Sequence, residues 1–77
     1  MHVMESASVS TAIQGHPQYS CRVFYHQSRD FGEVYFDTSV VEDRTTLEQY
    51  DWSPGLFDIS EAVYCFAEEK AWEVATA

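Results

Sequence analysis

The residues of this chain that could do chemistry are 13 carboxylates, three histidines and two cysteines. A metal site needs several of them on one face, yet Cys21 and His26 have opposite parity on a predicted strand and point to opposite faces. Arg22 could lower the pKa of the Cys21 thiol, but the alternation places Cys21 inward as an unreactive buried thiol. His16 falls in a turn and His2 in a frayed terminus. We therefore expect no metal and no cofactor.

Enzymatic motifs were not found either. The sequence contains no GxSxG, P-loop, GxGxxG or HExxH pattern. Acid–base catalysis needs two carboxyl groups whose environments separate their pKa values, and no pair here is placed at the rim of a pocket. Four basic residues against 13 acidic ones cannot form the basic stripe that binds nucleic acid directly. The chain is predicted not to be an enzyme.

The charge is concentrated in the C-terminal part. Residues 1–32 sum to zero, whereas residues 33–77 carry 11 carboxylates against Arg44 and Lys70, which accounts for the whole net charge of −9. A negative field of this density repels nucleic acid and membranes and attracts basic protein surfaces. The predicted partner is therefore a basic protein.

Length and composition predict one small folded domain over residues 1–77. Hydrophobic residues make up 45% and aromatics 16%, which argues against disorder. No CxxC and no signal peptide are found, so we expect a cytoplasmic protein with two free thiols, although one disulfide stays open. The longest apolar run, residues 62–67, is far shorter than the roughly 20 residues of a membrane span, which predicts a soluble protein.

Period-two alternation indicates three strands. It is modest over residues 6–13 and clear over 18–27, where β-branched and aromatic residues alternate with polar ones. Residues 14–17 form a predicted turn, and residues 28–32 a hairpin in which Gly32 takes the left-handed conformation, leading into a strand at 33–37. The result is a three-stranded antiparallel meander from about residue 5 to 38.

The remaining chain is predicted to be helical. Residues 45–52 can form a short helix capped by Asp43 or Thr45, and the last helix begins after Asp58 or Ser60 and runs to about Ala75. This gives an α+β fold in which a three-stranded antiparallel sheet packs against a C-terminal helix. A helical wheel predicts a buried stripe interrupted by Lys70. The stripe consists of Ile59, Ala62, Val63, Phe66, Ala67 and Val74.

The opposite side of this helix is almost entirely acidic, and Trp72 and Cys65 lie inside the acidic sector. A tryptophan among carboxylates suits a protein interface, where the indole anchors the partner and the charges steer it. The alternatives are a solvated surface that keeps the protein soluble, and a Trp72 that caps the core. Asp51 and Trp52 belong to a preceding segment of mixed acids and aromatics that could contact the same partner, unless Trp52 completes the core. The candidate partner-binding residues are Asp51, Trp52, Asp58, Glu61, Glu68, Glu69, Trp72 and Glu73.

In general character, a short and strongly acidic chain with a small sheet, a terminal helix and no catalytic motif resembles the small anti-CRISPR proteins of phages. The resemblance implies a stoichiometric inhibitor that acts in the cytoplasm of a host bacterial cell. It would bind a basic nucleic-acid-handling surface of a bacterial CRISPR effector or surveillance complex, with DNA mimicry as one mode. Antitoxin-like inhibitors of basic nucleases share this character. The main alternative is a homodimer or scaffold subunit that associates through a sheet edge or an aromatic surface, and a redox or metal protein is a third.

Overall fold

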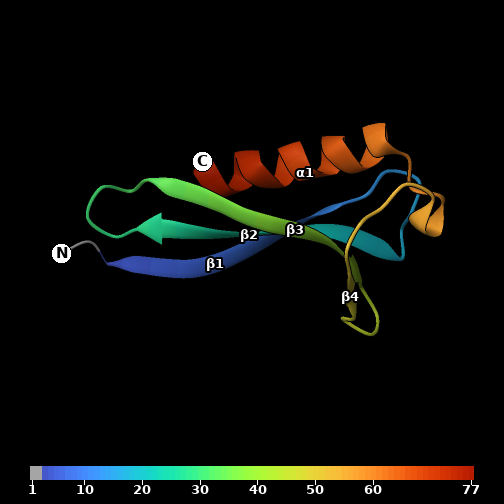
Figure 1. Cartoon of the computed structure of the whole chain (residues 1–77), viewed down its shortest axis with the longest axis horizontal. Coiled ribbons are helices and arrows are strands. Elements are labelled where there is room, and N and C mark those ends of the chain that lie inside the picture. Colours follow the sequence, from blue (N-terminus) through green and yellow to red (C-terminus); the bar gives the residue numbers. More distant parts are fainter. Residues whose placement is uncertain (1–2) are drawn as a thin grey trace.

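A computed structural model describes residues 3–77. They form an antiparallel sheet of four strands in the order β1-β2-β3-β4, with a C-terminal helix lying along one face (Figure 1). The predicted α+β class and the helix on the sheet are confirmed, and the sheet has a fourth strand that the sequence did not indicate. The elements are β1 Met4–Ala12, β2 Tyr19–Ser28, β3 Val34–Asp43, β4 Gln49–Tyr50, a 3₁₀ segment Leu56–Asp58 and α1 Glu61–Thr76.

The first two strands follow the predicted meander. β1 pairs with β2 so that Val9 lies opposite Val23, and the turn between them contains Gly15 at a φ of 81°. Gly32 has a φ of 70°, the left-handed conformation expected in the second hairpin. The β2–β3 register shifts between Phe24 and Tyr25, which marks a β-bulge.

The third strand is longer than predicted. It was expected to end near residue 38, but Val40 and Val41 continue the pairing with Arg22 and Cys21. Val41 is fully buried, because this part of β3 carries apolar side chains into the core. The change of sequence pattern after Thr38 therefore reflects a strand that becomes more buried, and it does not mark the end of the strand.

The predicted short helix over residues 45–52 is wrong. The Asp43 carboxylate accepts the N–H groups of Thr45 and Thr46 at 2.8 and 3.0 Å, and Leu47 has a φ of 65°. Asp43 N–H then donates to the Glu48 carbonyl at 2.9 Å, which starts the pairing of β3 with β4. An aspartate that binds the following N–H groups stabilises a turn as readily as a helix start, and here it makes a tight hairpin.

The core lies between α1 and the sheet. Cys21, Val23 and Val41 contribute from the strands and Tyr64, Ala67 and Ala71 from the helix, joined by Ile13 and Ile59. The two alanines allow the helix to approach the strands closely. Trp52 stacks on Tyr64 with ring centroids 4.9 Å apart, and its Nε1 donates to the Ile59 carbonyl at 3.2 Å, which closes one end of the core.

The helix begins as predicted but is rotated about its axis. Of the two expected caps, Ser60 is used: its hydroxyl accepts the Val63 N–H at 3.2 Å. The predicted stripe is wrong for Ala62, Phe66 and Val74, which are exposed; the side chains of Phe66 and Val74 are 54% and 57% accessible. The true buried line is turned by about 100° from the predicted one. It consists of Tyr64, Ala67 and Ala71.

The physical reason for this rotation is the polar partner that the sheet offers to Tyr64. The Tyr64 hydroxyl is hydrogen-bonded to Ser39 Oγ on β3, so a buried tyrosine is satisfied at this position. The rotation also resolves the conflict at Lys70, which the wheel had placed in the buried stripe. Lys70 is exposed, with Nζ 5.4 Å from the Phe66 ring centroid and 3.5 Å from a Glu73 oxygen.

Candidate functional site

The candidate site is an open groove between α1 and β3, with a volume of about 270 Å³. We call it the Trp72 groove. Three of the predicted partner-binding residues line it, together with an aromatic residue of β3 and the exposed cysteine of α1. The lining residues are Phe36, Cys65, Glu68, Glu69 and Trp72.

The aromatic wall of the groove is formed by two rings from different elements. Phe36 and Trp72 meet edge to face, with centroids 5.7 Å apart and ring planes at 87°. Such pairs are favoured over face-to-face stacking because the positive ring edge meets the negative ring face. Trp72 is half-buried, so its indole packs on the sheet and still borders the groove.

Glu68 differs from the other carboxylates of the helix because it is directed toward the sheet. Ser39 Oγ donates to Glu68 Oε2 and is also hydrogen-bonded to the Tyr64 hydroxyl. Beneath them, burial raises the pKa of the Cys21 thiol to about 11, and burial also raises the pKa of Tyr64 well above its ordinary value. Cys21 and Tyr64 therefore stay neutral at pH 7, and the Glu68 carboxylate, held by Ser39, lines the groove.

The other predicted carboxylates are exposed. Glu61 and Glu69 lie on α1 and make no ion pair within residues 3–77, whereas Glu73 pairs with Lys70 at 3.5 Å. Asp58 is exposed in the 3₁₀ segment and Asp51 in the loop that follows β4. The structure thus brings Glu68, Glu69 and Trp72 together in one groove.

Trp52, predicted as a contact residue or a core residue, lies in the core stack on Tyr64 and does not line the groove. Sequence reasoning missed Phe36. The bulge between Phe24 and Tyr25 moves Phe36 opposite Tyr25, a residue buried on the helix-covered side. The two adjacent aromatics, Tyr35 and Phe36, were the signal in the sequence, but simple alternation could not select the one that faces the helix.

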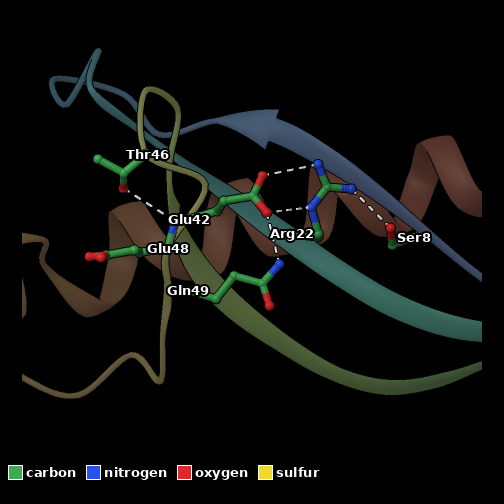
Figure 2. Close-up of polar contacts among 6 residues, drawn as sticks. All are labelled: Ser8, Arg22, Glu42, Thr46, Glu48 and Gln49. Carbon is green, nitrogen blue, oxygen red and sulfur yellow. Dashed lines mark hydrogen bonds and ion pairs between the residues drawn. The ribbon is translucent and has the colours of Figure 1, made fainter.

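A second cavity, of about 300 Å³, lies where the turn after β3 approaches the ends of β1 and β2. Glu42 lines it, and Figure 2 shows this carboxylate bound by its neighbours: Arg22 donates at 2.9 and 3.0 Å and Gln49 at 2.8 Å. Arg22 also donates to Ser8 Oγ at 2.9 Å. The Arg22 guanidinium lowers the pKa of Glu42. Since Glu42 is already bound in this way, the network is a structural link across β1, β2, β3 and β4.

The remaining chemistry-bearing residues are separated. Cys21 is buried and His26 lies on the other face of β2, with Nδ1 2.6 Å from Asp37 and Nε2 3.0 Å from Ser6 Oγ. No group of three or more metal-ligating side chains occurs within residues 3–77, and both cysteines are free thiols.

The part of the chain that the structure describes has no helix with the length and apolar character that crossing a membrane requires. Comparisons with protein-family models, with curated proteins and with solved structures found no match to this chain. The functional inference therefore depends on the chemistry of the groove and on the distribution of charge.

Proposed function

We propose that this chain is a stoichiometric, non-catalytic inhibitor that binds a basic, nucleic-acid-handling surface of a bacterial CRISPR effector or surveillance complex. The observation that carries the proposal is the Trp72 groove: an aromatic wall beside two carboxylates, in the part of the chain that holds the whole net charge of −9. A basic partner would be steered by the field and anchored at the indole.

The groove suits a cationic side chain in particular. The Phe36 and Trp72 rings offer apolar and π surface, which attracts a guanidinium or ammonium group. Glu69 is exposed and has no ion-pair partner within the described residues, while Glu68 is held in place by Ser39. An arginine or lysine of the partner would then contact an aromatic wall and a carboxylate at the same time.

The spacing of the outward carboxylates favours separate ion pairs over imitation of a DNA strand. Glu61, Glu69 and Glu73 lie about 12 and 6 Å apart along the axis at 1.5 Å per residue. Phosphates on one DNA strand are separated by about 3.4 Å. With Glu68 turned inward, the helix is a sparser line of charge than the sequence suggested, so the inhibitor would block a cationic surface at a few positions.

The test is binding to purified CRISPR effector and surveillance complexes by biolayer interferometry, together with inhibition of their DNA binding. Glu69→Lys reverses an exposed charge of the groove and should slow association at least about tenfold and weaken inhibition in parallel. Glu68 is unsuitable for this test, because its link to Ser39 would be lost as well.

Asp30→Lys is the matched control. It makes the same change of charge at an exposed position in the connection between β2 and β3 and should leave association within about twofold of the wild type, apart from the general effect of net charge. Equal effects of the two substitutions would contradict a role for the groove. Failure of the wild-type chain to bind any of the complexes would contradict the proposed class of partner.

A further inference from the structure

We propose that β1 pairs with β1 of a second copy of the chain, so that the four strands of each copy join in one continuous antiparallel sheet around a two-fold axis. This inference concerns the edge of the sheet remote from the Trp72 groove and does not depend on the proposed function.

The outer edge of β1 has backbone groups available for pairing. Arg29 N–H donates to the Val3 carbonyl at 2.9 Å, and hydrogen-bonded pairs alternate along an antiparallel ladder. The odd-numbered residues of β1 therefore bond to β2, and the even-numbered ones direct their N–H and C=O groups outward. Within residues 3–77, β1 pairs with no strand except β2. The outward residues are Met4, Ser6, Ser8, Ser10 and Ala12.

This edge carries none of the features that usually prevent strand addition. Isolated edges are protected by lysine, proline, a bulge or a short length. β1 is nine residues long, regular in its pairing with β2, and contains no proline or lysine. Its single charged residue, Glu5, is bound by Arg29 at the edge of the neighbouring strand, with Nε at 2.9 Å.

The sequence of β1 is compatible with pairing to itself. An antiparallel pair centred on Ser8, the middle of the strand, places Ser6 opposite Ser10 and Glu5 opposite Thr11, so no like charges face one another. The outward residues coincide with the hydrogen-bonded positions of this register, which allows about ten backbone hydrogen bonds between the two copies. A contact of a strand with itself is isologous and closes as a dimer.

The helix is placed correctly for such a dimer. α1 packs mainly on β1 and β2 and has fewer contacts with β3. With strands about 4.8 Å apart, a helix above the midline of β1 and β2 would be about 10 Å from its symmetry mate. Helices pack at interaxial distances of about 8–10 Å, so the two copies of α1 would contact each other across the axis.

Val74 is the residue expected at this helix contact. Glu68 and Trp72 reach Ser39 and Phe36 of β3, so the opposite flank of α1, which carries Val74, faces the β1 edge. Thr11 is hydrogen-bonded to the Ala67 carbonyl, and Ser8 lies about 10 Å back along β1. α1 runs antiparallel to β1 and rises about 1.5 Å per residue, so the same distance corresponds to six to seven residues of helix and leads from Ala67 to Val74. The exposed Val74 would therefore meet its own copy near the axis.

For two copies of the chain, charge favours association through the β1 edge over association through the opposite edge of the sheet. Residues 1–32, which include β1 and β2, sum to zero, while the remainder of the chain carries −9. Association through the opposite edge, formed by β3 and β4, would bring together strands that carry several carboxylates, whereas the only charged residue of β1, Glu5, is bound by Arg29. The Trp72 groove lies on the other flank of α1 and would stay open in the dimer.

The first test is sedimentation equilibrium of the full chain at micromolar to millimolar concentration. We expect a mass approaching twice 8.9 kDa for the wild type and for Ser10→Ala. Ser10→Pro removes one outward N–H without removing a β1–β2 hydrogen bond, a position at which an edge strand accepts proline. It should weaken the dimer at least about tenfold while circular dichroism shows an unchanged fold.

Cross-linking tests the β1–β1 dimer independently, and it applies even if Ser10→Pro does not fold. In a Cys65→Ser background, Val74→Cys should form a covalent dimer under mild oxidation at least about tenfold faster than Ala62→Cys, an exposed position about 18 Å away along α1. A monomer throughout the concentration range would overturn the proposal. Equal rates of cross-linking at the two positions would overturn it as well, as would a dimer that a folded Ser10→Pro leaves unchanged.

Discussion

At the scale of single residues, Glu42 stabilises the fold because its carboxylate is charged and enclosed by donors. Its pKa is lowered by the hydrogen bond from Arg22, so its contribution to the free energy of unfolding is present above the ordinary glutamate pKa and is lost as pH falls through the folded value. Glu42→Gln should therefore reduce the free energy of unfolding at pH 7 by about 1–3 kcal/mol. Urea unfolding measures this change.

Urea unfolding at acidic pH tests the direction in which the contribution of Glu42 to stability changes with pH. Below about pH 4 the wild type loses the contribution of the charged Glu42, so its difference from Glu42→Gln should shrink. Asp43, whose pKa is lowered mainly by the N–H of Thr46, continues to make both proteins sensitive to acid. Glu69→Gln, at an exposed position, is the control and should change stability little at either pH. A constant difference between wild type and Glu42→Gln at all pH values would contradict this account.

The two thiols should differ strongly in reactivity. Cys21 is completely buried and its pKa is raised to about 11, so little thiolate forms and reagents cannot reach it. Cys65 is exposed. A disulfide-exchange reagent should titrate one thiol rapidly in the native protein and the second only after denaturation. Cys65→Ser should abolish the rapid phase, and Cys21→Ser should preserve it. Rapid reaction of both thiols in the native protein would contradict the predicted difference in reactivity.

At the scale of elements, the stability of α1 depends on the capping of its N-terminus. The Ser60 hydroxyl satisfies the Val63 N–H, one of the first helical donors that have no partner within the helix. Ser60→Ala should lower the free energy of unfolding by about 1 kcal/mol, measured by thermal or urea unfolding. Ser53→Ala makes the same chemical change at an exposed loop position and should be nearly neutral. Equal losses from the two substitutions would show that Ser60 does not act as the cap.

At the scale of the whole molecule, the net charge of −9 must oppose folding, since it brings carboxylates closer together than in the unfolded chain. Raising NaCl from about 20 to about 200 mM shortens the screening length and should stabilise the protein. We expect a gain of about 1 kcal/mol, or roughly 4–8 °C in the midpoint of thermal unfolding. A midpoint that falls with salt would mean that the ion pairs outweigh the repulsion.

Local patterns predicted much of this fold. Alternation located the first two strands, glycine at positive φ marked their turns, and a serine before an apolar run marked the start of α1, because each of these signals acts over a few neighbouring residues. The concentration of charge in the second half is likewise a property of the sequence alone. For the candidate site, the sequence supplied Glu68, Glu69 and Trp72 as one acidic and aromatic cluster on the last helix.

The tertiary structure decided what depends on distant partners. The sequence cannot show that Ser39 forms hydrogen bonds with Tyr64 and Glu68. These bonds fix the rotation of α1, which leaves Phe66 and Val74 exposed and directs Glu68 inward. A bulge in the β2–β3 pairing brings Phe36 to Trp72 and completes the groove. Both outcomes depend on contacts between residues far apart in the chain, where the free energy of packing and of buried hydrogen bonds outweighs helical periodicity and strand alternation.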